Sequence, residues 1–395
     1  MLIDEIKSLS KKYASEFIAI RRHLHANPEL SYQEYETSKF IQQKLREFGI
    51  PFKIKAATGV VGLIEGNTSK RVIALRADMD ALPIREENDV EYRSTREGIM
   101  HACGHDVHTT CLLGAAKILN EMKRQWDGTI KLIFQPGEEK NPGGASLMIA
   151  EGVLKDPKPE AIFGLHVNPQ LETGKLSFRA GQVMASADEL YFTIKGKGGH
   201  AASPQSTVDP ILIASHLVIS LQQVISRNKD PFDPSVLSIT SINGGTATNV
   251  IPDEVKLTGT FRAMNEDWRK KAHELIERTT RELVHSMGGT AELHIDKGYP
   301  VVYNNEKLNE KAKDLGRQFA GAENVEETEM RMGAEDFGYY SQVIAGCFFR
   351  LGTGNIKKHI TAGVHTPHFN IDEDAIEIGM GMMACLGASI EFQKF

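Results

Sequence analysis

The stretch Arg71–Pro83, RVIALRADMDALP, decides the fold. Its apolar part, VIAL, is typical of a strand that is buried on both faces, as strands of parallel sheets are. Asp78 and Asp80 follow where the apolar run stops. The next apolar segment, at residues 107–124, has the spacing of a helix, so the chain alternates between strand and helix from here on.

Two more strands repeat this arrangement of an apolar run with polar residues at its end. The run TIKLIFQ (129–135) leads into Glu138 and Glu139, and the run AIFGLHV (161–167) is read as a strand ending in His166. The alternation predicts an α/β domain with a mainly parallel sheet and helices on both faces. Because ligands bind beyond the carboxyl ends of the strands in such sheets, we expect these polar groups to converge.

A different pattern begins near residue 182. Strands and helices then follow in the order β-α-β-β-α-β, which is the order of a ferredoxin-like α+β unit. We therefore expect an inserted domain at residues 185–295. The main domain would be discontinuous and consist of residues 1–184 and 296–395.

Composition and charge exclude several classes of partner. The 395 residues carry a net charge of −6, with acidic and basic residues interspersed, so we expect neither nucleic-acid binding nor attachment to an anionic membrane. The start of the chain lacks the apolar core of a signal peptide, and no apolar run reaches the about 18 residues that span a bilayer. We expect a cytoplasmic protein whose cysteines stay reduced.

The stretch Met100–Thr110, MHACGHDVHTT, concentrates side chains that bind borderline metals such as zinc, manganese or cobalt. Thiol, imidazole and carboxylate groups gather there, at His101, Cys103, His105, Asp106 and His108. A closed structural zinc site would use four cysteines and histidines at short spacing, whereas the candidates here include carboxylates and span a long segment. His23 and His25 have no such neighbours and are interpreted as surface or capping groups.

Three residues of the expected inserted domain are candidates for contacts with a substrate. His200 lies in the glycine-rich turn GKGGHAASP, where an imidazole could stabilise a developing oxyanion or could be an ordinary surface residue. Arg262, at the end of an alternating strand, could bind a carboxylate or form a structural ion pair. Asn249 lies in the segment NGGTATNVIPDEV, and the pattern alone assigns it no role.

Nearly the full length of the chain resembles the metal-dependent amidohydrolases related to aminoacylase. The branch it resembles holds hippurate hydrolase, N-acetyl-amino-acid deacetylases and plant indole-acetyl-amino-acid hydrolases. The resemblance is carried by ordered motifs, namely RRHLHANPELSYQE, LRADMDALPI, MHACGHDVHT, FQPGEE, GLHV, GKGGHAASP, NVIPDEV, GAEDF and HTPHF. These motifs are specific for the family and do not identify the substrate.

The resemblance implies a two-metal site in a zinc-aminopeptidase-like catalytic domain. The implied metal ligands are Cys103, His105, Glu139, His166 and His365. The last motif selects His365 over His368. Glu138 matches the general base of the family, and Asp80 matches the aspartate that orients a ligand. The inserted domain resembles a lid and dimerisation domain, in which His200, Asn249 and Arg262 match positions linked to catalysis or substrate binding.

The implied reaction is hydrolysis of the amide bond of N-acyl amino acids, such as N-acetyl or N-benzoyl derivatives. A metal-bound water would attack with Glu138 as general base, releasing a carboxylic acid and a free amino acid. The resemblance also implies two divalent ions per subunit, Zn²⁺, Mn²⁺, Co²⁺ or Ni²⁺, and a homodimer or higher homo-oligomer formed through the lid. The alternatives are a metallo-carboxypeptidase or dipeptidase, and a binding protein without activity.

Overall fold

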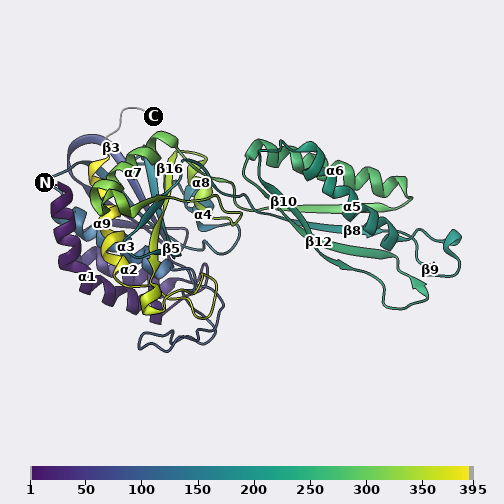
Figure 1. Cartoon of the computed structure of the whole chain (residues 1–395), viewed down its shortest axis with the longest axis horizontal. Helices are drawn as coiled ribbons and strands as arrows, with labels where there is room; N and C mark the ends of the chain where they lie inside the picture. The colour runs from purple at the N-terminus through teal and green to yellow at the C-terminus, as the bar shows by residue number, and fades with distance from the viewer. Residues whose placement is uncertain (1, 391–395) are drawn as a thin grey trace. The chain divides into compact units, whose positions relative to one another are not determined.

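The computed structural model describes residues 2–390, which form two compact units (Figure 1). Unit 1 runs up to Val183 and includes Tyr303–Glu329 and the residues from Asp336 onward, and unit 2 consists of Met184–Val302 and Met330–Glu335. Unit 2 therefore extends past residue 295, where the sequence suggested that it would end. Its return segment belongs to it because Met184 forms a β-bridge with Arg331, which the sequence pattern does not reveal.

Unit 1 is built on an eight-stranded sheet. From one edge to the other the strands are β1 (Phe52–Lys55), β2 (Gly59–Glu65), β4 (Asp127–Gln135), β3 (Asn67–Asp78), β5 (Ala161–Glu172), β16 (Ala345–Gly354), β6 (Leu176–Phe178) and β15 (Val325–Glu327). The central strands β4, β3, β5 and β16 run parallel, whereas β1, β2 and β6 pair antiparallel with their inner neighbours. The sheet is mixed and mostly parallel, which confirms the expected α/β class.

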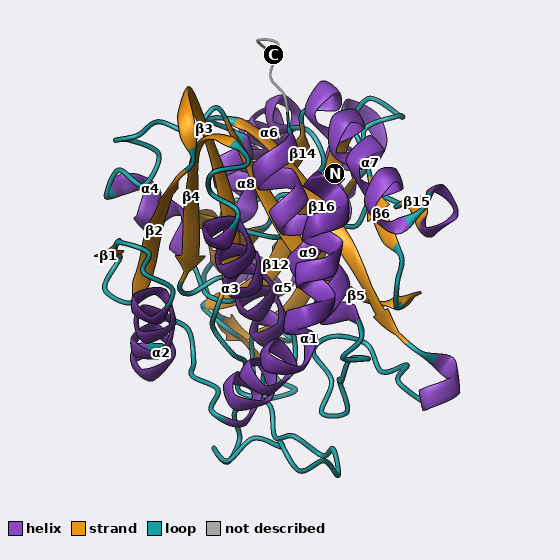
Figure 2. Cartoon of the chain, turned by 90° about the vertical axis from the view of Figure 1, so that its left-hand side faces the viewer, coloured by secondary structure: helices purple, strands orange, loops and turns teal. Residues whose placement is uncertain are grey.

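Helices cover both faces of this sheet, as expected. One face carries α1 (Leu2–Ala26), α2 (Tyr35–Glu47), α3 (His105–Glu121), α7 (Glu306–Ala320) and α9 (Ala375–Ser389), and the other carries α4 (Gly144–Ala150) and α8 (Phe337–Ser341) (Figure 2). Helix α3 is buried almost all round because it lies between the sheet and the helices α1 and α9. The short 3₁₀ turns η2 (Ala322–Asn324) and η3 (Ile356–Lys358) complete this unit.

The strand ends lie at one level, although β5 is longer than expected. Asp78 pairs with Gln135 at the ends of β3 and β4, and Arg76 pairs with Gly164 of β5. His166 follows Gly164 by two residues and therefore lies level with Asp78, inside β5 and not at its end. The strand continues because its partner β16 also continues past this level.

Unit 2 has the strand and helix order expected from the sequence. Its elements are β8 (Asp188–Lys195), α5 (Pro210–Asn228), β10 (Ser235–Asn243), β12 (Glu254–Ala263), α6 (Glu266–Ser286) and β13 (Thr290–Lys297), with the short β9 (Gly199–His200), η1 (Pro204–Ser206) and β11 (Val250–Ile251). The sheet order is β10-β12-β8-β13, and all neighbouring strands are antiparallel. Helices α5 and α6 pack on this sheet and enclose a separate core (Figure 1).

Two elements remain, β7 (Gly181–Met184) and β14 (Val302–Asn304), which pair in a small sheet of their own. Within residues 2–390, every helix is either too short or too polar to cross a lipid bilayer.

Candidate metal centre

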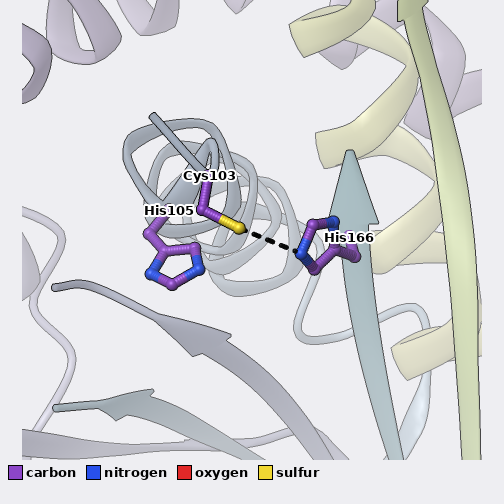
Figure 3. A group of neighbouring side chains, drawn as sticks. All are labelled: Cys103, His105 and His166. Atoms are coloured by element: carbon purple, nitrogen blue, oxygen red, sulfur yellow. Dashed lines mark hydrogen bonds between the residues drawn. The ribbon is translucent and has the colours of Figure 1, made fainter. Parts of the chain in front are cut away.

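Side chains from two segments of unit 1 meet near the end of β3. Cys103 precedes α3, His105 is the first residue of α3, and His166 comes from β5 (Figure 3). The Sγ atom of Cys103 lies 3.5 Å from Nε2 of His166. One potential ligand atom from each of the three residues lies within 4.8 Å of the others, a spacing that a single metal ion could bridge.

A second group shares Cys103 and adds residues from two further segments. Nε2 of His365 lies 3.3 Å from Sγ of Cys103 and 3.3 Å from Oε1 of Glu139. Nε2 of His105 lies 3.8 Å from Oε1 of Glu139 and 3.9 Å from Oε2 of Glu138. The structure thus brings together all five predicted ligands and the predicted base, from positions between 103 and 365 of the chain.

The histidine rings are oriented by partners on their far side. Nδ1 of His105 lies 3.1 Å from Oδ1 of Asp80, and Nδ1 of His166 lies 2.8 Å from the carbonyl oxygen of Val167. When the proton at Nδ1 donates to these oxygens and Nε2 is deprotonated to bind a metal, the lone pair of each Nε2 faces the other candidate ligands. A hydrogen bond of this kind is the usual support of a metal-bound histidine.

Two buried polar atoms at the centre of the group make no hydrogen bond within the described part of the chain. They are Nε2 of His105 and Oε1 of Glu139. Leaving a buried polar atom without a partner costs about 1–3 kcal/mol. An imidazole nitrogen and a carboxylate oxygen that face each other beside a thiol form the mixed nitrogen, oxygen and sulfur donor set of zinc and similar ions, so these residues fit a divalent metal.

The charges of the group also favour a cation. Burial and the carboxylate of Glu139 raise the pKa of the Cys103 thiol. The hydrogen bond to Cys103 and the nearby carboxylate of Glu139 raise the pKa of His365 to about 10. Burial, with a smaller effect of Arg350, holds the pKa of His166 well below its usual range, so its imidazole is neutral and can bind a metal. A bound cation would stabilise the thiolate form of Cys103.

Two unusual backbone conformations give the site its shape. Gly104 is the N-cap residue of helix α3 and has φ +83°, and a Cβ there would lie 2.5 Å from a methyl carbon of Val167. A glycine is therefore required between Cys103 and His105. His365 has φ +61°, and its N–H donates to the carbonyl of Ala102 at 2.8 Å. This bond ties the segment carrying His365 to the residue next to Cys103.

His368, the histidine that the sequence comparison rejected, lies elsewhere. Its Nε2 atom is 3.2 Å from Oε2 of Glu87, and both side chains are exposed. His365 is therefore the histidine of this motif that faces Cys103.

Sequence reasoning gave His108 and Asp78 no specific role. Nδ1 of His108 lies 2.5 Å from Oδ1 of Asp78, and its Nε2 accepts the N–H of Val167 at 2.9 Å. With Asp78 and His105 it forms a third group of metal-binding side chains. Both its ring nitrogens are already engaged, so His108 supports the backbone next to His166 and is not a free ligand. The i, i+3 spacing of His105 and His108 on one helix was the available signal.

The interpretation of His25 as a surface or capping group is wrong. Helix α1 continues to Ala26, and His25 is completely buried. Its Nδ1 lies 2.7 Å from Oδ2 of Asp106 and its Nε2 lies 3.1 Å from Oε1 of Glu86. The polar sequence around it suggested a turn, because Asp106 and Glu86 are distant in the chain. His23 is exposed and stacks on Phe40.

The three candidates of the inserted domain lie in unit 2, where they do not form one cluster. His200 is exposed, and it pairs with Val250, the residue after Asn249. Arg262 lies near the start of β8, because its neighbour Phe261 pairs with Asp188, whereas His200 follows the end of β8. His200 and Asn249 are thus close together, and Arg262 lies at the opposite end of the sheet. Their roles stay predictions.

The model of the peptidase family M20/M25/M40 matches residues 74–388. The chain belongs to this family. The match covers all the candidate metal ligands of unit 1 and the whole of unit 2.

Relatives in this peptidase family have related activities in their names. An IAA-amino acid hydrolase of Arabidopsis thaliana is 41% identical over 374 residues, which cover 93% of this chain and 84% of that protein. An N-acyl-L-amino acid amidohydrolase of Geobacillus stearothermophilus is 42% identical over 305 residues, covering 77% and 82%. Thermostable carboxypeptidase 2 of Saccharolobus solfataricus is 39% identical over 382 residues, covering 96% of both chains.

Among solved structures, the protein YXEP of Bacillus subtilis is described as a dinuclear metal binding peptidase from the M20 family. It is 34% identical, with a TM-score of 0.84, and the match covers 95% of this chain and 98% of that one.

Proposed function

We propose that this M20-family protein hydrolyses the amide bond of N-acyl amino acids and releases a carboxylic acid and a free amino acid. One observation carries the proposal: the turn after β4 directs both Glu138 and Glu139 toward Nε2 of His105, at 3.9 and 3.8 Å. Side chains next to each other on an extended strand would point to opposite faces. A base and a ligand side by side are what hydrolysis with a metal-activated water requires.

The site would hold two divalent ions. Cys103, His105 and His166 form one candidate ligand group, and Cys103, Glu139 and His365 form the other. Cys103 belongs to both groups, so we assign it to the shared position. When bound, such ions polarise the scissile carbonyl and make the proton of a water easier to remove. The donor set suits Zn²⁺, Mn²⁺, Co²⁺ or Ni²⁺.

The remaining roles follow from the contacts. The carboxylate of Glu138 is buried and is the group that takes the proton from the attacking water and passes it to the leaving nitrogen. Asp80 keeps the ring of His105 oriented through Nδ1. Cys103 would not act as a nucleophile, because a thiolate that is held as a metal ligand is unavailable for attack on the substrate.

His200 and Asn249 of unit 2 would contact the substrate, and Arg262 would bind a carboxylate. Arg262 and His200 lie at opposite ends of the unit 2 sheet, which supports a homodimer in which the two residues serve different sites. The exposed edge strands β10 and β13 are suited to such pairing. The four buried free thiols are consistent with a reducing, cytoplasmic location.

A substrate panel with metal reconstitution tests the function. The purified protein, loaded in turn with Zn²⁺, Mn²⁺, Co²⁺ and Ni²⁺, should release free amino acid from N-acetyl and N-benzoyl amino acids, and a chelator should abolish the release. Faster cleavage of dipeptides or of C-terminal residues would favour the carboxypeptidase activity named for one relative. No hydrolysis of any amide by the metal-loaded protein would refute the proposal.

A further inference from the structure

The segment Glu29–Glu34, ELSYQE, lies against the metal centre although none of its residues is a candidate ligand. It runs beside the end of β3, where Leu30 forms a parallel bridge with Ala81 and the N–H of Ala81 donates to the carbonyl of Glu29 at 2.8 Å. Three of its side chains contact either Asp80 or the turn that carries Glu138 and Glu139.

Glu34 contacts the turn that leads to Glu138 and Glu139. Its side chain is fully buried, and Oε1 accepts the N–H of Gly137 at 2.8 Å, one residue before Glu138. The same oxygen accepts the N–H of Tyr32 at 2.9 Å, and Oε2 accepts the hydroxyl of Thr58 at 2.9 Å. The carboxyl group is therefore held from both sides and offers a fixed acceptor to the turn.

Ser31 and Tyr32 hold the two ends of the same turn. The hydroxyl of Ser31 donates at 2.7 Å to Oδ2 of Asp80, and this oxygen also accepts the N–H of Glu139 at 3.0 Å. The hydroxyl of Tyr32 donates to the carbonyl of Lys140 at 2.6 Å and accepts the N–H of Gly143 at 3.0 Å.

We propose that Glu34, assisted by Ser31, is a positioning residue that directs Glu138 and Glu139 into the metal centre. Gly137 has φ +57°, and a Cβ there would lie 2.2 Å from the ring of Tyr32, so the turn is closely packed against this segment. The N–H of Gly137 is buried, and without Glu34 it loses its acceptor. The turn then gains by rotating that N–H toward water, which moves the two glutamates that follow.

This inference rests on the proposed function for the role of Glu138, but its main test does not need a substrate. Glu34→Ala removes the acceptor, and Glu34→Gln keeps an amide oxygen for Gly137 and a donor that Thr58 can accept. Glu29→Ala is the matched control. Its carboxylate is equally buried but accepts the N–H groups of Glu36 and Thr37 at the start of α2.

The measurement is metal affinity, from titration of the metal-free protein with Co²⁺ followed by its visible absorption. Loss of a partner that orients a ligand typically weakens metal binding about 10–100-fold. We expect a loss in this range, with an altered spectrum, for Glu34→Ala. Glu34→Gln should stay within about threefold of the parent, and Glu29→Ala should bind Co²⁺ with parental affinity and spectrum.

A parental affinity and spectrum of Glu34→Ala would overturn the proposal, and so would an equal loss in Glu29→Ala. If Glu34→Ala does not fold, Ser31→Ala decides, because it removes only the hydroxyl that Asp80 accepts. A weakened and spectrally altered Co²⁺ site in Ser31→Ala supports the proposal, and an unchanged site contradicts it. A parent protein that binds Co²⁺ but cleaves no amide would refute the function and leave this test intact.

Discussion

Two buried clusters of histidine and aspartate, one in each unit, look alike in composition and differ in their hydrogen bonding. In unit 2, the carboxylate of Asp188 accepts hydrogen bonds from Nε of Arg269 at 2.9 Å, from Nη2 of Arg269 at 2.5 Å and from Nε2 of His273 at 2.7 Å. In unit 1, Asp80 accepts from His105, but Nε2 of His105 makes no hydrogen bond within residues 2–390.

A ligand site and a structural ion pair differ in whether their buried polar atoms are left without partners. In the unit 2 cluster, the guanidinium of Arg269 and the ring of His273 donate to Asp188, so both oxygens of this carboxylate already have partners. The unit 1 cluster adds a thiol and two glutamates, and a carboxylate oxygen of Glu139 also lacks a hydrogen bond among the described residues. Unused ligand atoms that face one another, and not buried histidine–aspartate pairs as such, mark the metal centre.

The largest expected effect concerns the base in the unit 1 cluster. Glu138→Gln should lower kcat for the best N-acyl amino acid by about 10²–10⁴-fold, because an amide cannot accept the proton. Its metal content, measured by elemental analysis, should equal that of the parent. A variant that turns over at a near-parental rate would show that another group is the base.

A substitution in the unit 2 cluster should lower the stability of the protein and leave its metal binding unchanged. Asp188→Ala leaves the guanidinium of Arg269 buried without its anion and removes the acceptor of His273, and breaking a buried pair costs about 3–5 kcal/mol. Denaturant unfolding should register this loss, while the metal stoichiometry of the folded fraction stays unchanged. Loss of metal from this variant would undermine the contrast between the clusters.

Removal of Cys103, which belongs to both candidate ligand groups, tests whether the unit 1 cluster binds metal. Cys103→Ala should weaken metal binding by at least about 100-fold, more than the loss of an orienting partner does. Cys111→Ala is the control, since Cys111 is also buried in this unit but packs in the core. Equal metal affinities of the two variants would contradict the assignment of Cys103.

The smallest effect is a difference in pH dependence between the units. Burial and the charge of Asp80 raise the pKa of Glu34 to about 7. In the metal-free protein, the contribution of Glu34 to the free energy of unfolding is therefore fully present below about pH 4.5 and is lost as the pH rises to about 7. Burial alone would raise the pKa of Asp188, but hydrogen bonds from His273 and Arg269 lower it. The contribution of Asp188 to the free energy of unfolding is therefore lost as the pH falls below 3.8.

Glu34→Gln measures the first of these contributions. Between about pH 4.5 and 7, the free energy of unfolding of the metal-free variant should fall by about 1–3 kcal/mol less than that of the metal-free parent. Denaturant unfolding of both proteins at several pH values gives the comparison. Parallel stability curves over this range would mean that the pKa of Glu34 is not raised.

Much of the fold could be read from local patterns. The runs VIAL (72–75) and IKLIF (130–134) predict buried strands because they are apolar apart from Lys131, and the alternation with helices then implies a parallel sheet. The β-α-β-β-α-β order of unit 2 could also be predicted from the sequence pattern. His25 was misread because its partners Glu86 and Asp106 lie 61 and 81 residues away, and local polarity carries no information about such contacts.

The sequence by itself determined the element order, the family and the set of candidate ligands, since these depend on residue types and on spacing along the chain. Only the tertiary structure decided which atoms face one another: that Cys103 lies between His166 and His365, that both nitrogens of His108 are engaged, and that Glu34 supports the turn before Glu138. The reason is that hydrogen bonds and metal sites depend on distances of a few ångströms between segments that the chain keeps far apart, and those distances exist only after the sheet and its helices have packed.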